Sequence, residues 1–389
     1  MYRIGQEEID AVARVIHSRK LFKTGAETSN AEESMRALFQ SKHALLMTSG
    51  MAALVSALTA LGIGPGDQVI VPAYTYIATA MAVVSAGAIP VIAEVDDTLT
   101  IDPDDVVRKI TPSTKAIIPV HIQGFPCNMD ALCAIAQEHG LKIVEDACQA
   151  DGAGYHGKRL GTIGDAGALS FNQYKLISVG EGGALLTGDD KVFERALIYH
   201  DSSAVAYFGN QLEGVTEPLF CGSEFRTNEI QAAILNVQLS RMDGIIADLR
   251  RSRTALKAAL GDTLRFAPSH DEAGDLATTL PIVFDSEAEA RAFSAALKEK
   301  FGITATLPID TGKHVYRNWT SIMAQRGALH PLMDPFKMAA NRGIVPEYRA
   351  DMCPRTLDLL ARTVYIGVNP DWTDGEIAQL AAKLIAAAR

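Results

Sequence analysis

The sequence has few cysteines, and their arrangement does not suggest a metal site or a disulfide framework. Five cysteines occur among 389 residues, and no two of them stand in a Cys-x-x-Cys spacing. An odd number of cysteines in mostly apolar surroundings favours free thiols in a reducing compartment. We therefore predict a cytoplasmic protein without a metal centre.

An excess of basic residues is also missing. The chain has 36 Lys and Arg against 46 Asp and Glu, which gives a net charge of −10. Nucleic-acid binding needs a basic surface, so we expect no nucleic-acid partner. The charge balance does not exclude a small anionic ligand, because such a ligand needs only a local site.

The sequence lacks a clear membrane span, although residues 68–93 are uncharged and long enough to cross a bilayer. Pro72, Gly87 and Pro90 divide this stretch into strand-like, helix-like and strand-like parts. We predict two buried strands around a helix, with no membrane association. The acidic residues near the N-terminus also argue against an export signal.

The first half of the chain does contain alternating strand and helix patterns. Short β-rich runs such as IPVIAEVD and LKIVEDA are separated by helical segments with recognisable caps. This alternation predicts an α/β fold with a large, mixed, mostly parallel sheet that helices cover on both faces. Ligands of such sheets bind beyond the carboxyl ends of the strands.

A second, smaller α/β domain is expected at the C-terminus. A single helical pattern runs over residues 228–260 and would connect the two domains. We assign residues 1–250 to the large domain and residues 251–389 to the small one. The irregular residues 200–224 form a predicted loop, and a loop of that length usually has a function.

Residues 152–157, GAGYHG, match the glycine spacing of a dinucleotide site and nearly match a phosphate-binding loop. Both motifs require a helix to begin at the glycines. The following residues contain frequent glycines and have no helical period, so we predict a glycine-rich loop or hairpin. A nucleotide-dependent kinase or dehydrogenase would depend on this motif alone.

Lys175 lies in the segment SFNQYKLISVGEGG, among residues such as Phe171, Leu176 and Ile177. A lysine among apolar groups loses hydration, which favours the free amine that attacks a carbonyl group. An ordinary surface lysine on a turn is the alternative, and the spacing alone does not decide between the two.

Two other segments bear on this choice. Glu145 and Asp146 end an apolar strand, where a carboxylate could pair with the protonated ring nitrogen of pyridoxal phosphate (PLP). A helix-capping or ion-paired acid is the alternative. In TSGMAAL, residues 48–54, Ser49 and the N–H groups of a helix start could bind a phosphate. An ordinary helix with a serine cap and no bound phosphate is the alternative, because it would have the same sequence pattern.

Together these segments resemble the DegT family of PLP-dependent sugar aminotransferases, which have the fold-type I architecture. The resemblance rests on the order SGMAAL, PAYTYIAT, VEDACQADGA, SFNQYK with GEGG, and FR-xx-EIQAA. It covers nearly the whole chain and is strongest over residues 47–183. Such a series of motifs is much more specific than any one of them.

The resemblance implies a PLP site and a role for each matching residue. Lys175 would be the catalytic residue, bound covalently to PLP and moving protons during transamination. Asp146 would bind the pyridine nitrogen, Gln149 the phenolic oxygen, and Tyr76 would stack on the ring. The phosphate would be bound at a helix start and a strand end, by Ser49, Gly50, Met51 and Ser170.

The sequence departs from the family pattern at two positions. Met51 stands where the family usually has threonine, so a hydroxyl is missing while the backbone contacts remain. In GSEFR, Glu224 replaces an asparagine that reaches the phosphate in the neighbouring subunit. A carboxylate would repel a phosphate, so we do not count Glu224 as a ligand.

By resemblance, the enzyme would move an amino group from an amino acid, glutamate being the expected donor, to a keto sugar. The amino sugar would serve cell-surface polysaccharide or secondary metabolite biosynthesis, and the enzyme would be a homodimer with its active site at the interface. The segment at residues 311–319 resembles the branch that takes sugars without a nucleotide, such as 8-oxo-octulosonate. The candidate substrate-binding residues are His121, Tyr174, Arg226, His314 and Arg317.

Several alternatives stay open at this point. The acceptor could be a nucleotide-linked keto sugar, or the chain could be a non-catalytic sugar-binding regulator on the same scaffold. Sugar dehydration is a further PLP reaction in the family, although its dehydratases carry histidine in place of the lysine. His121, Arg226 and the segment around Arg317 could each be structural instead of substrate-binding.

Overall fold

A computed structural model describes residues 3–201 and 214–389 of the chain. Its centre is a seven-stranded sheet in which every strand is parallel to its neighbours except β9, which is antiparallel to both β1 and β8. The predicted mixed, mostly parallel sheet is therefore confirmed. In spatial order the strands are β1 (His43–Met47), β9 (Gly183–Thr187), β8 (Ala166–Ser170), β5 (Lys142–Asp146), β4 (Thr114–Ile117), β2 (Gln68–Pro72) and β3 (Ile89–Ala93).

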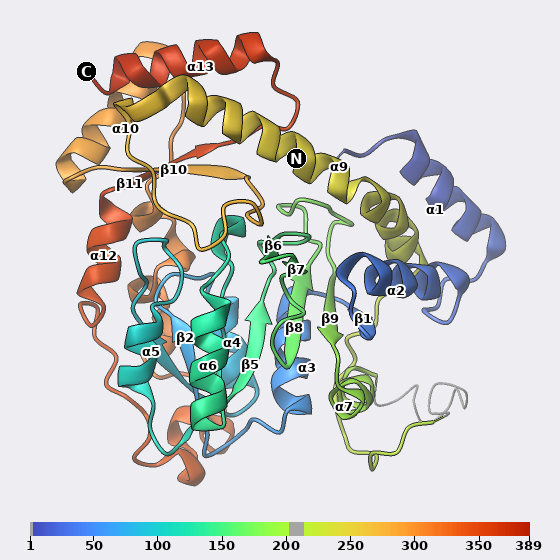
Figure 1. Cartoon of the computed structure of the whole chain (residues 1–389). Coiled ribbons are helices and arrows are strands. Elements are labelled where there is room, and N and C mark those ends of the chain that lie inside the picture. Colours follow the sequence, from blue (N-terminus) through green and yellow to red (C-terminus); the bar gives the residue numbers. More distant parts are fainter. Residues whose placement is uncertain (1–2, 202–213) are drawn as a thin grey trace.

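Helices cover both faces of this sheet, as Figure 1 shows, with α5 and α6 in front of the strands and α3 behind them. Helix α3 packs on β8 and β9 and against α4 and α7. The strands between them are buried along nearly their whole length, which is why they read as continuous apolar runs. These helices are α3 (Gly50–Ala60), α4 (Ala78–Ser85), α5 (Pro103–Lys109), α6 (Met129–His139) and α7 (Asp190–His200).

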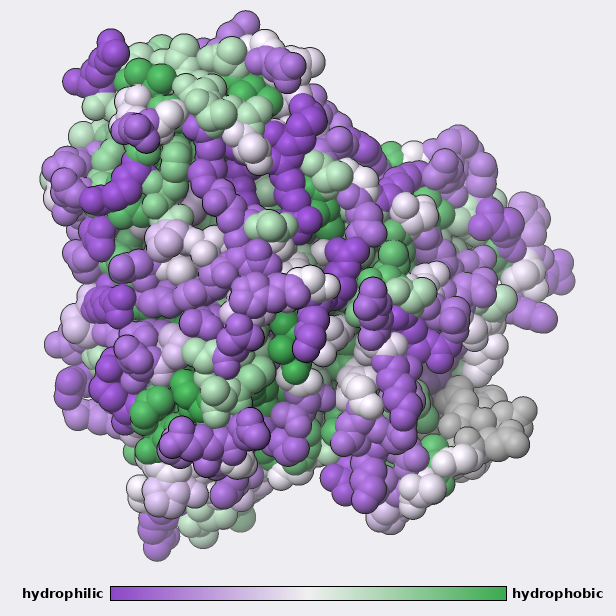
Figure 2. Space-filling view, in the orientation of Figure 1, coloured by the Kyte–Doolittle hydropathy of each residue, from purple (hydrophilic) through white to green (hydrophobic). Residues whose placement is uncertain are grey.

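The uncharged residues 68–93 form β2, α4 and β3, as predicted. Both strands are fully buried, so burial in a protein core explains the missing charges. Among the described residues no helix has the length and apolar character to cross a bilayer. The face in Figure 2 is mostly hydrophilic, and hydrophobic residues occur there in small groups.

A long helix, α9 (Glu229–Leu260), connects the sheet region to a C-terminal unit. The side chain of Asn228 caps it by accepting hydrogen bonds from the N–H groups of Ile230 and Gln231. Helix α9 packs against two N-terminal helices and the last helix. The proposed boundary at residue 250 falls inside α9 and stays a prediction. The packing helices are α1 (Gln6–Ser18), α2 (Ala26–Phe39) and α13 (Asp374–Ala387).

The C-terminal unit contains an antiparallel strand pair with helices beside it (Figure 1). Its elements are β10 (Thr279–Val283), β11 (Thr363–Gly367), α10 (Glu287–Phe301), α11 (Thr320–Met323) and α12 (Pro354–Ala361), with 3-10 turns between residues 308 and 341.

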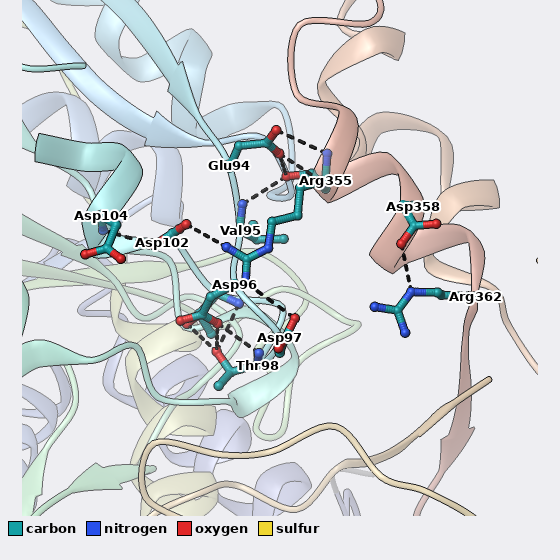
Figure 3. A network of polar contacts seen from close by, with 12 residues as sticks. Glu94, Val95, Asp96, Asp97, Thr98, Asp102, Asp104, Arg355, Asp358 and Arg362 are labelled. Carbon is teal, nitrogen blue, oxygen red and sulfur yellow. Dashed lines mark hydrogen bonds and ion pairs between the residues drawn. The ribbon is translucent and has the colours of Figure 1, made fainter. Parts of the chain in front are cut away.

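Polar contacts bind the start of α12 to the segment after β3 (Figure 3). The Glu94 carboxylate accepts hydrogen bonds from the N–H groups of Arg355 and Thr356, at 3.2 and 2.7 Å. The Arg355 guanidinium pairs with Asp102 at 2.8 Å and with Asp97 at 3.4 Å. Glu94 thus caps α12 from another part of the fold.

The glycine-rich residues 152–157 belong to a hairpin, as predicted. Its strands are β6 (Gly154–Tyr155) and β7 (Lys158–Arg159), which pair antiparallel. His156 and Gly157 both have positive φ, at 47° and 82°, which suits a two-residue turn of the primed type. No helix starts here, so the glycines belong to the hairpin and its turns and do not form a nucleotide motif.

Candidate functional site

A first cavity, of about 200 Å³, lies at the carboxyl ends of the sheet strands. Its lining comes from the start of α3, the segment after β2, the end of β5, and the end of β8 with the turn that follows. All the residues that the sequence predicted to bind a cofactor line this one cavity. They are Ser49, Gly50, Met51, Tyr76, Asp146, Gln149, Ser170 and Lys175.

Asp146 supplies a buried carboxylate with a fixed direction to the first cavity. Its side chain accepts a hydrogen bond from the Thr79 hydroxyl at 2.7 Å and from the Cys148 N–H at 3.2 Å. Only 5% of the residue is exposed. A carboxylate fixed in this way can bind a cationic N–H group of a ligand with little reorganisation.

Glu145, the preceding residue, has a structural role. Its buried carboxylate accepts hydrogen bonds from the N–H groups of Gly161, Ile163 and Gly164, at 2.8, 2.6 and 2.7 Å. It also contacts the ring of His121 at 3.1 Å. These contacts hold the loop that leads into β8 and leave Glu145 out of the cavity lining.

The N-terminus of α3 also lines the first cavity. Ser49 caps this helix by accepting a hydrogen bond from the Ala52 N–H at 3.1 Å. The first N–H groups of a helix have no partner within it, so this end of the cavity can bind an anion. A Cβ at Gly50 would lie 2.5 Å from the Cys148 sulfur, so the close approach of α3 requires glycine. The buried Ser170 adds a hydroxyl.

Lys175 lies between the first cavity and a second one of about 220 Å³, and it lines both. It is half-buried, whereas Tyr174 beside it is 80% exposed. The turn that carries it is fixed by hydrogen bonds from the Lys175 N–H to the Asn172 carbonyl and from the Gln173 N–H to the Gly180 carbonyl. Gln149 also lines both cavities, and its side-chain oxygen accepts from the Gln123 N–H at 3.1 Å.

His314 reaches the second cavity from the C-terminal unit. Its carbonyl accepts the Thr75 N–H at 3.0 Å, and its ring lies 5.3 Å from that of Tyr76. Burial, with a smaller effect of Lys175, lowers the pKa of His314 below its usual value. Its imidazole is therefore neutral near pH 7 and can donate or accept a hydrogen bond. Tyr174 lines the same cavity.

The other candidate substrate residues lie elsewhere. His121 is fully buried, and its ring nitrogens contact Glu145 and the Cys127 N–H, so it has no contact left for a ligand. Arg317 is exposed and does not line either cavity. Near it, the buried Trp319 donates to the Lys313 carbonyl at 2.8 Å, which makes this segment a structural turn.

Arg226 is occupied by ion pairs. Its guanidinium lies 2.8 Å from the buried Asp201 and 2.6 Å from Glu224. This pair gives the carboxylate that replaces the family's asparagine a cationic partner within its own chain. Part of the predicted loop at residues 200–224, residues 202–213, lies outside the described part of the chain.

Several residues at the two cavities were not among the candidates from sequence. The first cavity includes Thr79, Cys148 and Glu181, and the second includes Gln123, Asp151 and Thr278. Asp151 could have been noticed, since it follows Gln149 by two positions in VEDACQADGA. Gln123 and Thr278 come from loops whose sequences have no signal of their own.

The first cavity suits a ligand that carries both an anionic group and a protonated ring nitrogen. The helix start and two hydroxyls fit the anion, and the fixed Asp146 carboxylate fits the ring nitrogen. Lys175 adds an amine to the same lining. These donors match PLP, whereas the described residues contain no cluster of His, Cys, Asp and Glu that could hold a metal ion.

Comparisons with known proteins agree with this chemistry. The model of the DegT/DnrJ/EryC1/StrS aminotransferase family matches residues 2–321. The chain is 42% identical over 235 residues to dTDP-3-amino-3,4,6-trideoxy-alpha-D-glucose transaminase of Streptomyces venezuelae, a match that spans 60% of each protein. It is 33% identical to the spore coat polysaccharide biosynthesis protein SpsC of Bacillus subtilis (strain 168), over 96% of this chain and 92% of that one.

A solved structure shows the same architecture. The aminotransferase from Psychrobacter cryohalolentis superposes with a TM-score of 0.79 at 29% identity, and the alignment covers 98% of this chain and 97% of that one. The fold is that of the fold-type I PLP aminotransferases, as the sequence predicted.

Proposed function

The chain belongs to the DegT/DnrJ/EryC1/StrS aminotransferase family, and we propose that it uses PLP in the first cavity to transfer an amino group from glutamate to a keto sugar. The observation that carries the proposal is the gathering of all the predicted cofactor residues around one cavity that Lys175 lines. The family is one of sugar aminotransferases that serve amino sugar biosynthesis.

The residues of the first cavity would each bind one part of PLP. The N–H groups at the start of α3, with Ser49 and Ser170, would hold the phosphate. Asp146 would keep the pyridine nitrogen protonated, Gln149 would bind the phenolic oxygen, and Tyr76 would cover the ring. When bound, PLP supplies the electron sink that makes the substrate's α-proton acidic.

Lys175 would move protons during the reaction. Its free amine would take the proton from the α-carbon of the amino donor and hold it on the lysine nitrogen until it returns to carbon, which is general acid-base catalysis at a positioned nitrogen. The keto sugar passes through the same steps in reverse order. Because Lys175 lines both cavities, one side chain can reach the cofactor and the substrate.

The second cavity would bind the sugar part of the acceptor. Gln123, Thr278 and the neutral His314 provide uncharged hydrogen-bonding groups, which suit hydroxyls. The acceptor would be a keto sugar without a nucleotide, such as 8-oxo-octulosonate. A nucleotide-linked keto sugar is the second candidate, since a relative is named as a transaminase of a dTDP-linked sugar. Assays with one acceptor of each class would separate them.

We also propose a cytoplasmic homodimer with the active site at the interface. Large hydrophobic side chains are exposed at the N-terminal end of the chain, among them Ile4, Ile9 and Ile16 at 63, 61 and 51%. Such residues suit a surface that a second copy covers. Sedimentation equilibrium should give twice the chain mass of 41.7 kDa, and a monomer at micromolar concentration would contradict this.

The test of the function uses the purified chain reconstituted with PLP. The protein should become yellow, and glutamate should bleach the colour as the amino group is transferred. Lys175→Ala should lose the lysine-dependent absorbance and at least about a hundredfold in rate, while the exposed Lys191→Ala should change neither. No absorbance in the wild type would favour a regulator, and colour that glutamate does not bleach would point to another donor or to dehydration.

A further inference from the structure

The residue that contacts the Gln149 side chain has a strained backbone. Gln123 lies in the segment between β4 and α6, and its φ and ψ are 54° and 18°. This left-handed conformation is uncommon for a residue with a Cβ. Gly124, the next residue, is also left-handed, with a φ of 85°. A strained residue of this kind persists only where its surroundings fix it, and such residues occur mainly at functional sites.

The C-terminal unit supplies the contacts that fix Gln123. The Thr278 hydroxyl donates to the Gln123 carbonyl at 2.8 Å, and the Thr279 hydroxyl donates to its side-chain oxygen at 3.1 Å. Both threonines are buried. The Leu276 N–H donates to the Gly124 carbonyl at 3.1 Å, and a Cβ at Gly124 would lie 2.3 Å from the Leu276 Cβ. The conformation of Gln123 therefore depends on a segment that is distant in the sequence.

Gln123 in turn decides how the Gln149 amide is oriented. The Gln123 N–H donates to the side-chain oxygen of Gln149 at 3.1 Å. A backbone N–H can only donate, so the amide oxygen must face it, and the NH₂ group lies on the other arm of the amide. Within the described part of the chain this NH₂ group has no hydrogen-bond partner. Gln149 lines both cavities, so two N–H donors are left for a ligand.

We propose that Gln123 is a positioning residue that keeps the Gln149 amide turned so that it donates to the phenolic oxygen of the cofactor. The inference rests on the proposed function, which assigns that oxygen to Gln149, and deepens it. An amide that rotated would present its own oxygen, which cannot donate and would repel an anionic phenolic oxygen. Thr278 and Thr279 act through Gln123, so the C-terminal unit helps to set the charge of the cofactor.

The test is a pH titration of the visible absorbance of the full chain at saturating PLP, which changes with the proton that the phenolic oxygen shares. A hydrogen bond to this oxygen favours its anionic form, so loss of the bond should raise the titration midpoint. Gln149→Met removes the donor and should raise the midpoint by about one pH unit or more. Thr279→Val removes a hydroxyl that lines neither cavity and should raise it by at least about 0.3 pH unit. Thr279→Ser should restore the wild-type midpoint.

Two comparisons separate positioning from a general loss of stability. In the Gln149→Met background, Thr279→Val should cause no further shift, because the donor that it helps to orient is gone. Thr363→Val, in β11, removes another buried hydroxyl, which donates to the Leu359 carbonyl at 2.6 Å. It should leave the midpoint unchanged.

The possible outcomes separate the two proposals. A folded Thr279→Val protein with the wild-type midpoint, or a shift that persists without the Gln149 amide, overturns the role of Gln123 and leaves the aminotransferase function intact. A wild type with no absorbance that depends on Lys175 overturns the proposed function, and the role of Gln123 with it. If Thr279→Val does not fold, Gln123→Met, which removes the same hydrogen bond from its other side, is titrated in its place, and the same raised midpoint is required of it.

Discussion

Glu145 and Asp146 are neighbours in β5, yet their carboxylates are bound on opposite faces of the sheet. Three backbone N–H groups hold Glu145, whereas the hydroxyl of Thr79 and one N–H hold Asp146 beside the first cavity. Side chains of successive strand residues alternate in this way. One acid thus stabilises the fold, and the other is available to a ligand.

Substitutions of these two acids should have opposite effects. Glu145→Gln places an amide among N–H donors, and we expect the free energy of unfolding to fall by about 2 kcal/mol with little change in PLP absorbance. Asp146→Asn should keep the unfolding energy and slow the glutamate half-reaction about a hundredfold or more. Urea unfolding and stopped-flow absorbance measure the two quantities. Equal effects of both variants on stability would contradict the assignment.

Gly50→Ala should weaken PLP binding. The new Cβ would approach the Cys148 sulfur to 2.5 Å and the Ser170 Cβ to 3.0 Å, so the start of α3 must move away from the phosphate end of the cavity. We expect the dissociation constant of PLP, measured by equilibrium dialysis, to rise about tenfold or more. Gly244→Ala, in α9, is the control, because nothing lies within 4 Å of a Cβ added at this position. It should stabilise the protein by up to about 1 kcal/mol without changing PLP affinity.

Glu94→Ala should destabilise the docking of α12. The variant loses the acceptor for the N–H groups of Arg355 and Thr356 (Figure 3), and the loss of such a cap costs about 1 to 2 kcal/mol. Asp97→Asn removes the exposed partner of Arg355 and should cost less than about 0.5 kcal/mol. Urea unfolding measures both. The cap assignment fails if the Asp97 variant is the less stable protein.

His200 should make stability fall in mild acid. Burial, with the charge of Lys23 as the next cause, lowers the pKa of His200 to about 4. Below about pH 6.5 the unfolded chain binds a proton that the folded protein does not, so unfolding becomes easier as the pH falls from about 6.5 to about 4. The contribution reaches about 3 kcal/mol. His200→Gln should flatten this part of the curve of unfolding energy against pH, and an unchanged slope would refute the assignment.

Local patterns in the sequence were sufficient for much of the fold and for the residues that face the first cavity. Pro72 and Gly87 divided a membrane-like stretch correctly, because Pro72 is the last residue of β2 and Gly87, with a φ of 90°, lies in the turn between α4 and β3. Pro90 lies inside β3 and does not interrupt it. The motif order placed Asp146 and Lys175, since Asp146 ends the buried strand β5 and Lys175 lies in the turn after the buried strand β8.

Tertiary contacts decided what the sequence left open. Glu145 and Asp146 have the same local context, and only their partners from distant loops assign their roles. The ring of His121 contacts Glu145 and the Cys127 N–H. The spacing of these residues in the sequence does not indicate that they are in contact. The fold also places Asp151 in the lining of the second cavity, which Lys175 lines as well, and the sequence alone did not indicate this.

The reversed strand β9 has a consequence for how the enzyme matures. It joins β1 to β8, so His43 pairs with Thr187 and Met47 with Gly183, and the phosphate end of the site exists only after these distant segments meet. Contacts between such remote parts of a chain form slowly. A nascent chain in which β9 has not yet joined β1 and β8 would therefore lack this end of the site, and we expect the proposed cofactor to bind only after the sheet has closed.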